Sequence, residues 1–569
     1  MQAARRPQWN ILAPAPNEYL STAPVPPLVG QLLYNRGIAP EDVHSFLQPS
    51  EPRGASPFRL PDMSRAVERI YSALLRKEHI GVYGDFDVDG VSATGLLVRV
   101  LRNLGTFPHV YIPERTAEGH GLNERGLRQM KEQGVSLVIT VDCGVSDLPA
   151  AHKAREMGLD LIITDHHIPP ATLPPAHAVV DAKRPESQYP FPDLCGVGVA
   201  YKLAQALLHG HRRTSYLAQM LDLVALGTVT DLVALRDENR YLVRLGLQAL
   251  NSTTGPGLRE LICVSNLQPG KLDADNISWA LGPRLNAASR MDSANTSYQL
   301  LMTESEEEAR RLAVELDTRN AERKRAADEA YETACHKLAG KFDLPLLFDA
   351  DESYPAGVMG LVASKLAEQH YRPAIIAHRA DGVCKGSGRS IPEFNLVDAL
   401  LQCQDMLVAF GGHPQAAGFT VETDHLPVLE ERLIQVAEQE LSGLDLRPRL
   451  TIDAEVPPSA LAGETFRLMQ KMEPFGQGNP PPTFLSRGIE VLECRNSGET
   501  KRLNLKFRDQ GVVWQAIDFE SRVAMCDIAS PVDIVYTVRT TLWNGEEVLQ
   551  FKILDAVPSS ATSAPSTPE

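Results

Sequence analysis

Three short apolar runs in this chain each end at once in Asp or His. The runs read HIGVYGDFDVDG from His79, LVITVDCG from Leu137 and LIITDHH from Leu161. Carboxylates that share a small space repel one another unless cations neutralise them. The pattern predicts a metal-dependent enzyme that holds more than one hard, oxygen-preferring cation. The side chains that a parallel sheet would gather at one edge are Asp85, Asp87, Asp142, Asp165, His166 and His167.

Two of these motifs also have interpretations that involve no catalytic metal site. In DFDVDG, Asp85 and Asp87 point to the same side of an extended segment, but a calcium loop or a helix cap could show the same spacing. An EF-hand would need a preceding helix, whereas a strand is expected here. In TDHH, imidazole and carboxylate together suit manganese, iron or cobalt better than calcium. A surface His pair is the alternative, and the two other strand-end motifs argue against it.

The segments around the motifs alternate between strands and helices. Strands are expected at 79–83, 136–141, 160–164 and 177–180, separated by amphipathic stretches such as VSATGLLVRVLRNLG and NERGLRQMKEQG. This alternation implies an α/β fold with a parallel sheet and right-handed crossovers. Ligands of such sheets bind beyond the carboxyl ends of the strands, where the acidic residues fall.

The rest of the chain predicts further units. A long polar helix, opened by a capping-box signal from Thr303 to Glu306, should bridge two domains over about 36 residues, or roughly 54 Å. Short β-like runs near the C-terminus suggest a small barrel. The expected boundaries are 1–45 for an N-terminal helical segment, 46–300 for the catalytic domain with a helical extension, 301–341 for the bridging helix, 342–445 for a smaller α/β domain, 446–557 for the barrel and 558–569 for a disordered tail.

Composition limits the class of protein. The 569 residues allow about three or four domains, and 43% hydrophobic with 22% charged residues is typical of globular proteins. No apolar run approaches the roughly 18 residues of a membrane span, and a signal peptide is not expected. The eight cysteines form no CxxC pair, which argues against a zinc site and a disulfide framework and favours the cytoplasm. The net charge of −16 counts against nucleic acid as a partner, although a basic channel can coexist with an acidic exterior.

The motifs together resemble the DHH phosphoesterase superfamily, with Asp231 in LGTVTDLVAL as a fourth element. Later segments narrow the resemblance to the RecJ family of bacterial single-strand-specific 5′→3′ exonucleases, whose domains are called DHH, DHHA1 and OB. It covers about residues 30–556, in the family's order. The segments that carry it are LGPRLNAASRM at Leu281, LDTRNAERK, GVMGLVASKL at Gly357, KGSGRS at Lys385, GGHPQAAGFT at Gly411 and MEPFGQGNPPPTF at Met472.

The resemblance implies roles for the acidic and histidine residues. His167 would contact the scissile phosphate, and Asp165 would orient a ring. Asp89 and Asp181 are less certain, and Asp222 reads as a polar residue inside a helix. Two divalent cations, Mn²⁺ or Mg²⁺, would support in-line hydrolysis that releases 5′-mononucleotides without a covalent protein nucleophile. The implied metal ligands are Asp85, Asp87, Asp142, His166 and Asp231.

The resemblance also implies a separate set of residues that binds the 5′ phosphate; taken alone, Gly-rich turns are usually only turns. Gly-rich turns form anion-binding nests, and a guanidinium can grip a phosphate through two hydrogen bonds. Held at a fixed distance from the metals, this set would measure one nucleotide from a 5′ end and make the enzyme an exonuclease. The residues are Ser387, Arg389 and Ser390 in KGSGRS, Gly411, Gly412 and His413 in GGHPQAAG, and a clamp of Arg115, Arg284 and Arg290.

The C-terminal barrel resembles an OB fold, which often binds single strands. Its expected basic and aromatic face contains Lys501, Arg502, Lys506 and Arg508 near Phe507 and Trp514. A solvated strand remains the alternative for each of these residues.

The chain departs from the family pattern at three places. Tyr354 and Pro355 stand where the family has Trp-His, Ser289 replaces a Gly, and His120 replaces a Tyr. None of these removes an implied metal ligand, so activity is still expected. Processivity and the handling of the 5′ end are the properties that these changes would alter.

Two alternative functions remain open. A DHH phosphodiesterase of short oligonucleotides or cyclic dinucleotides typically lacks the barrel and the bridging helix. A non-catalytic single-stranded-DNA scaffold is expected to have lost metal ligands. The main interpretation predicts a monomer that acts in DNA repair and recombination, with single-stranded DNA, a single-strand-binding protein and a helicase as partners.

Overall fold

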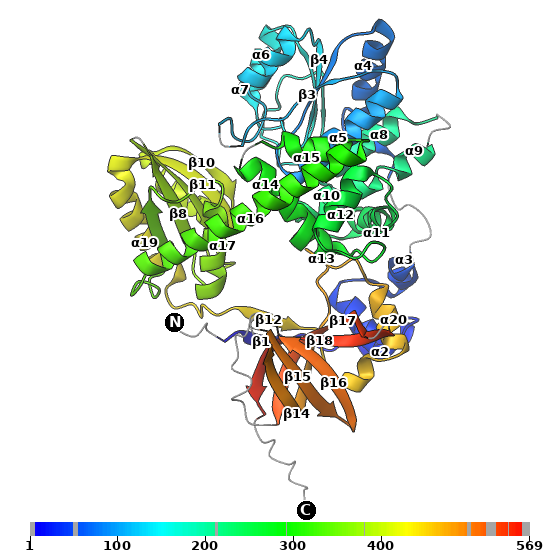
Figure 1. The fold of residues 1–569 in the computed structure, drawn as a ribbon, viewed down its shortest axis with the longest axis vertical. Helices are drawn as coiled ribbons and strands as arrows, with labels where there is room; N and C mark the ends of the chain where they lie inside the picture. The colour runs from blue at the N-terminus through cyan, green and yellow to red at the C-terminus, as the bar shows by residue number, and fades with distance from the viewer. Residues whose placement is uncertain are drawn as a thin grey trace, which may run out of the picture.

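The computed structural model describes residues 6–48, 55–115, 117–210, 214–291, 293–380, 382–497, 502–518, 531–543 and 546–559. Figure 1 shows an α/β domain at the top, a second α/β domain at the left and a β-barrel at the bottom. The long helix α16 (Glu306–Lys337) joins the first two. Within the described residues, no helix combines the length and apolarity needed to span a membrane.

The first domain is built on a five-stranded, fully parallel sheet in the order β3-β2-β4-β5-β6. The strands are β2 (Ile80–Tyr83), β3 (His109–Tyr111), β4 (Leu137–Val141), β5 (Asp160–Thr164) and β6 (Ala178–Val180). The bounds of β2, β4, β5 and β6 agree with the predicted strands to within one residue. The fifth, β3, was not predicted, because it is a three-residue edge strand without a long apolar run.

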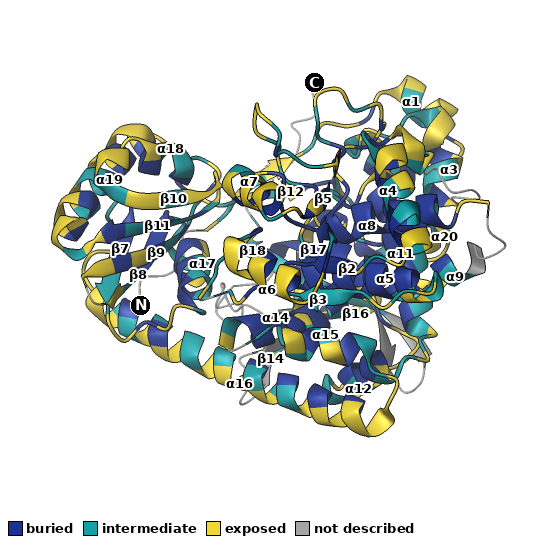
Figure 2. Ribbon diagram, turned by 90° about the horizontal axis from the view of Figure 1, so that it is seen from above, coloured by how far each residue is buried: buried dark blue, intermediate teal, exposed yellow. Residues whose placement is uncertain are grey.

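Helices cover both faces of this sheet, and alternate strand residues face each layer. Val82, Ile139 and Ile162 belong to the core beneath α5, α8 and α10 (Leu221–Thr230), whereas Val138 and Ile163 face α6 and α7. Helices α5 and α8 are largely buried and appear dark blue in Figure 2. The bounds are α4 (Met63–Arg76), α5 (Val88–Asn103), α6 (Glu124–Glu132), α7 (Leu148–Glu156) and α8 (Gly196–Leu207).

A helical extension follows the sheet and leads into α16. It contains α9 (Thr214–Ala218), α10 (Leu221–Thr230), α11 (Asp237–Asn251), α12 (Pro256–Val264), α13 (Ala274–Asn276), the π-helical turn η3 (Ile277–Leu281), α14 (Gly282–Met291) and α15 (Asn295–Met302). Asp222 lies in α10, as predicted.

The bridging helix is confirmed, but its start is not where the capping-box signal placed it. Ser305, in extended conformation, is the N-cap, and its Oγ accepts a 3.3 Å hydrogen bond from the N–H of Glu308. The 32 residues of α16 correspond to about 48 Å. Figure 2 shows a largely exposed helix, which agrees with its polar sequence.

The second α/β domain has a five-stranded sheet in the order β10-β11-β9-β8-β7. Only β7 and β8 are parallel; the other pairs are antiparallel. Its elements are β7 (Leu347–Asp351), α17 (Met359–His370), β8 (Ala374–Ala380), β9 (Val383–Arg389), α18 (Leu396–Leu401), β10 (Leu407–His413), β11 (Ala416–Glu422) and α19 (Leu426–Leu441).

The C-terminal strands close into a barrel, because β14 pairs with β15 on one side and with β17 on the other. The remaining contacts run from β15 through β16 and β18 to β17. The elements are β12 (Arg449–Ile452), β13 (Ala454–Glu455), α20 (Glu464–Gln470), β14 (Thr483–Ser497), β15 (Arg502–Asp509), β16 (Val512–Asp518), β17 (Val532–Trp543) and β18 (Glu546–Pro558).

The N-terminal segment packs on this barrel. Strand β1 (Gln8–Ile11) pairs in parallel with β12, and α2 (Pro27–Asn35) and α3 (Val43–Leu47) share one core with the barrel. The short helix α1 (Asn17–Thr22) lies between β1 and α2 in sequence. Residues 8–47 are therefore structurally part of the barrel domain.

The barrel also touches the helical extension. The N–H of Leu235, just after α10, donates a 2.7 Å hydrogen bond to the carbonyl of Gln477, and Arg236 Nε donates a 2.9 Å bond to the carbonyl of Gly478. Among the described cysteines, six are free thiols and Cys494 is disulfide-bonded, a bond that the sequence did not predict. The predicted tail lies outside the described residues from 560 onward.

Candidate metal centre and phosphate site

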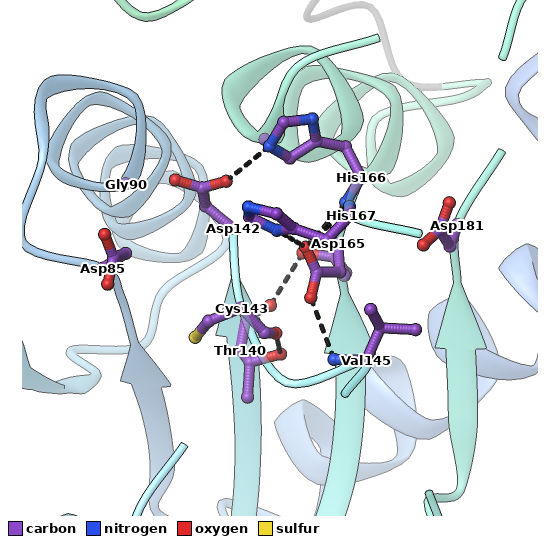
Figure 3. Close-up of polar contacts among 12 residues, drawn as sticks. Asp85, Gly90, Thr140, Asp142, Cys143, Val145, Asp165, His166, His167 and Asp181 are labelled. Atoms are coloured by element: carbon purple, nitrogen blue, oxygen red, sulfur yellow. Dashed lines mark hydrogen bonds and ion pairs between the residues drawn. The ribbon is translucent and has the colours of Figure 1, made fainter. Parts of the chain in front are cut away.

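The carboxyl ends of β2, β4 and β5 place the predicted acidic and histidine residues at one edge of the first sheet (Figure 3). The register aligns Tyr83 with Thr140 and Val141 with Thr164, so the residues that follow these strands become neighbours. The prediction that the three motifs meet is confirmed.

Asp142 adopts a left-handed backbone conformation, with φ of 63°. Its side chain lies directly against Gly196 at the start of α8, where a Cβ would come within 2.4 Å of Asp142 Oδ1. A glycine at 196 is therefore required to let this carboxylate approach the helix.

The possible ligand atoms form three overlapping groups. Within each group, all the atoms lie within 4.8 Å of one another. We call Asp85, Asp87, Asp142, His166 and Asp231 the metal centre; each of these five predicted ligands occurs in at least one group. The groups are Asp85, Asp87 and Asp142; Asp142, His166 and His167; and Asp89, His166 and Asp231.

Several atoms of the metal centre are buried without a hydrogen-bond partner among the described residues. They are Oδ1 of Asp142, Oδ2 of Asp231 and both ring nitrogens of His166. Asp142 Oδ1 and His166 Nε2 lie only 3.0 Å apart. Buried polar atoms are normally satisfied, so a set of lone pairs that converge without a donor fits a bound cation.

Electrostatics support the same conclusion. Burial, followed by repulsion from Asp89 and Asp87, raises the pKa of Asp142 well above its usual range and that of Asp231 to about 9. Burial and the charge of Asp85 also raise the pKa of Asp87. Without cations, these carboxyl groups cannot all be ionised near neutral pH.

The two histidines differ in electrostatic state. Burial and the neighbouring His167 lower the pKa of His166 to about 3, so its imidazole is neutral and suited to bind metal. His167 Nδ1 lies 2.7 Å from Asp165 Oδ1. Burial alone would raise the pKa of Asp165, but hydrogen bonds from His167 and the backbone, including Val145 N at 2.9 Å, outweigh it and keep the pKa below normal. Asp165 thus holds the His167 ring in place.

The sequence left the roles of Asp89 and Asp181 uncertain. The two carboxylate oxygens of Asp89 accept hydrogen bonds of 2.6 and 2.8 Å from the N–H groups of Gly196 and Val197. It therefore caps α8 and at the same time adds negative charge beside His166 and Asp231. The signal was present, because Asp89 is the third acid of DFDVDG. Asp181 follows β6 directly, and its Oδ1 accepts a 2.7 Å bond from Lys183 N.

Cationic side chains converge near the metal centre. Arg115, Arg290, Arg323 and Arg389 form what we call the arginine cluster. Burial, and then the charges of the other three arginines, lower the pKa of Arg290 to about 9. Within the described part of the chain, none of the four forms an ion pair with a carboxylate, and the Nε atoms of Arg290 and Arg323 have no hydrogen-bond partner. A group of half-buried guanidinium ions that no carboxylate pairs at contact distance is a site for an anion.

Arg323 was missed by sequence reasoning. It lies on α16, where its only distinction from the other polar residues is its place in LDTRNAERK. Arg284, by contrast, was predicted to join the clamp, but its Nε donates a 2.8 Å bond to Asp317 on α16. Arg284 is thus engaged in a helix–helix ion pair.

The predicted Gly-rich turn at KGSGRS is wrong. Residues 385–389 belong to strand β9, and Ser390 follows it. A Cβ at Gly386 would lie 2.2 Å from the Phe419 ring, and a Cβ at Gly388 would lie 2.4 Å from the Leu396 side chain. The glycines make room for packing, and no backbone nest forms there. Arg389 donates to Ser387 Oγ at 3.4 Å, whereas Ser390 Oγ donates to the carbonyl of Phe394 at 2.7 Å.

The other predicted nest also lies within a strand. Gly411, Gly412 and His413 end β10, which pairs with β11. His413 nevertheless reaches the metal centre, because it lines the same cleft of about 260 Å³. The cleft joins both α/β domains and is lined by Asp85, Phe86, Asp87, Arg115, His120, Asp142, His167, Asp231 and His413.

Among the described residues, the basic and aromatic side chains predicted to share one face of the barrel lie on two different sides of it. Phe507 and Trp514 pack against Phe551 in the barrel core, whereas Lys506 and Arg508 alternate with Phe507 and are exposed, where they pair with Glu493 and Glu490. Side chains alternate between faces along a strand, so the two kinds of residue lie on opposite sides. Arg502 begins β15, and Lys501 lies outside the described residues.

The departures from the family pattern have different environments. His120 Nδ1 lies 3.0 Å from Asp85 Oδ1, and its ring centroid is 5.1 Å from that of His167. Tyr354 is buried and its hydroxyl donates to Asp349, far along the chain from the first sheet. Ser289 is buried in α14 and donates to the carbonyl of Asn286. Only His120 touches the metal centre.

Comparisons with known proteins agree with this architecture. Family models match residues 79–228 as the DHH family N-terminal domain, 343–442 as the DHHA1 domain and 452–555 as the RecJ OB domain. The chain is 37% identical to the single-stranded-DNA-specific exonuclease RecJ of Bacillus subtilis, over 98% of this chain and 71% of that protein. It is 36% identical to the Escherichia coli protein of the same name, over 84% and 86% of the two chains.

Solved structures give the same result. The crystal structure of RecJ from Thermus thermophilus in complex with Mn²⁺ superposes with a TM-score of 0.82 at 28% identity, over 98% of this chain and 80% of that one. The Mg²⁺ complex of the same protein gives a TM-score of 0.78 at 27% identity, over 98% and 79%.

Proposed function

Because the chain belongs to the RecJ family of single-stranded-DNA-specific exonucleases, we propose that it removes 5′-mononucleotides from the 5′ end of single-stranded DNA with two divalent cations, Mn²⁺ or Mg²⁺. The observation that carries the proposal is the cleft that acidic residues and Arg115 of the first domain line together with His413 of the second α/β domain. One wall fits cations, and the other fits the phosphate of a strand end.

The residues of the metal centre would hold the cations. Bound divalent ions would acidify a water molecule and stabilise the attacking and leaving oxygens of an in-line displacement. His166 is neutral and presents Nε2 beside Asp142 Oδ1. Asp165 fixes the ring of His167, which is placed at the cleft to contact the scissile phosphate.

The arginine cluster would select the strand end. A terminal phosphate can accept hydrogen bonds from several guanidinium groups, whereas an internal phosphate has two of its oxygens esterified. A fixed distance between this cluster and the metal centre would set the cut at the first phosphodiester, which yields mononucleotides. Ser387, which contacts Arg389, belongs to the same wall.

We also propose that the enzyme works in DNA repair and recombination in the cytoplasm, as a monomer. A single-strand-binding protein and a helicase are the expected partners, because an enzyme restricted to single strands requires that duplex be opened first.

The test compares the wild type with Asp142→Ala on 5′-labelled and 3′-labelled single-stranded DNA, with Mn²⁺ and with EDTA. Asp160→Asn is the matched control, because Asp160 begins β5 at the opposite end of the same sheet. Metal-dependent release of labelled mononucleotide from the 5′ end, lost only in Asp142→Ala, would support the proposal. Tight DNA binding without cleavage would favour the scaffold, and cleavage confined to very short oligonucleotides would favour the small-substrate phosphodiesterase.

A further inference from the structure

Trp279 is a large aromatic side chain left 79% exposed. It lies in η3, the π-helical turn Ile277–Leu281. Ile277 and Leu281 are fully buried and anchor the turn, whereas Trp279 lies between them and projects to solvent. Single π-helical turns recur at functional sites, and an exposed indole has no role in the core.

The turn is seated next to the metal centre. Gly282, three residues after Trp279, packs against the end of α10, where a Cβ would lie 2.5 Å from Thr230 Cγ2. Thr230 immediately precedes the metal-centre residue Asp231. Leu232, on the other side of Asp231, is 68% exposed and has φ of 60°, an uncommon backbone conformation for leucine.

The same helical segment reaches the arginine cluster at its other end. Trp279 stands near its start and Arg290 near its end, where a Cβ on Gly357 would lie 2.2 Å from the Arg290 carbonyl oxygen. Eleven residues of helix separate the two, or roughly 16 Å. An aromatic ring and a phosphate-binding cluster thus stand at opposite ends of η3 and α14, with Asp231 close to the aromatic end.

We propose that Trp279 stacks on a nucleobase of the single-stranded substrate, on the 3′ side of the bond that is cut. The inference rests on the proposed function, in which the arginine cluster holds the 5′ end. Every base has a π face, so one tryptophan can stack on any of the four bases. An exonuclease that degrades strands of any sequence requires this tolerance.

The experiment uses the full chain and four proteins: wild type, Trp279→Ala, Trp279→Phe and Phe107→Ala. Phe107 is the matched control, because it is 80% exposed in the loop after α5, at the opposite end of that helix from Asp87. KM and kcat are measured on an oligothymidylate of about 20 nucleotides, on the same oligomer with abasic sites after its first two nucleotides, and on a 5′-phosphorylated dinucleotide.

Loss of one stacked base corresponds to a rise in KM of about 5- to 150-fold. We expect this rise for Trp279→Ala on the long oligomer, a smaller rise for Trp279→Phe, and none for Phe107→Ala. The abasic oligomer should show little difference between Trp279→Ala and wild type, and the dinucleotide should report an intact metal centre.

Equal KM values for Trp279→Ala and Phe107→Ala on the long oligomer would overturn the inference, as would an equal loss on the abasic oligomer. A wild type that degrades none of the three substrates would instead refute the proposed function. Quenching of tryptophan fluorescence by oligothymidylate in EDTA is an independent readout, and its persistence unchanged in Trp279→Phe would also contradict stacking.

Discussion

Gly196 and Asp142 touch: a Cβ on Gly196 would lie 2.4 Å from the Oδ1 atom that Asp142 directs toward His166. The N–H of Gly196 is also held by Asp89 at 2.6 Å. Helix α8 is therefore docked against two carboxylates of the site at once, and neither it nor Asp142 can shift alone.

This contact predicts that Gly196→Ala inactivates the enzyme without unfolding it. A methyl group at residue 196 would displace the Asp142 carboxylate, and a misplacement of about 1 Å can cost on the order of 100-fold in rate. The measurement is kcat on single-stranded DNA together with a melting curve. Gly198→Ala is the control, because a Cβ there would lie 3.4 Å from Leu194, an ordinary contact. Equal activity in the two variants would show that Asp142 need not lie against α8.

Arg323 should contribute to recognition of the strand end. Its Nε is buried without a partner beside Arg290, and a hydrogen bond to a charged group contributes about 1.5–3 kcal/mol. We expect Arg323→Met to raise KM about 10- to 150-fold on 5′-phosphorylated DNA and much less on DNA with a 5′-hydroxyl. Arg325→Met, on an exposed position of the same helix, is the comparison. If the ratio of KM values for 5′-hydroxyl and 5′-phosphorylated DNA is the same in Arg323→Met and Arg325→Met, Arg323 does not bind the terminal phosphate.

Lys202 and Glu238 form an ion pair inside the first domain, where their side chains are 2% and 5% exposed. Tyr189 adds a 2.5 Å hydrogen bond to Glu238. Lys202→Met should destabilise the fold by about 3–5 kcal/mol, because it leaves a buried carboxylate unpaired. Urea unfolding followed by circular dichroism would measure the loss. The double variant Lys202→Met with Glu238→Gln should recover most of it, and a double variant as unstable as the single one would show that packing is responsible.

Asp181 should make stability depend on pH. Burial, and to a lesser extent the charge of Asp165, raise the pKa of this fully buried carboxyl to about 7. A raised folded-state pKa means that the stabilisation is complete below the unfolded pKa and is lost as pH rises through about 7. In EDTA, the wild type should lose stability between about pH 4 and 7, on the order of 4 kcal/mol at most.

Asp181→Asn cannot titrate, so its stability should change less over the same range. The measurement is the urea midpoint at several pH values, with Asp160→Asn as the exposed control. Parallel pH profiles for wild type and Asp181→Asn would assign the dependence to other carboxyl groups.

The sequence was most informative where a pattern repeats. Three apolar runs that end in acids predicted both the parallel sheet and the meeting of Asp85, Asp142 and His166, because parallel strands end at one edge. It was least informative where one residue type serves two purposes. Gly386 and Gly388 look like turn residues, but they admit Phe419 and Leu396 into the core of a sheet.

Long-range placement was the other limit. Nothing local distinguishes Arg323 from the solvated charges around it on α16, or marks Arg284 as the partner of Asp317. In the barrel, Trp514 and Lys506 lie on neighbouring strands, and only the strand alternation sends one side chain inward and the other outward. Such roles depend on which face of an element meets which neighbour.

The pairing of β1 with β12 places an early segment of the chain in a domain whose strands follow both α/β domains. Residue 8 leaves the ribosome some 440 residues before its partner at 449, which corresponds to roughly 20–90 s of synthesis. During this interval the two α/β domains can already be folded. The apolar side chains of α2 and α3 are still exposed to solvent, because the barrel that buries them has not been made. The barrel is therefore completed after both α/β domains, and a nascent chain arrested before residue 449 would leave β1 without its partner strand beside a finished catalytic domain.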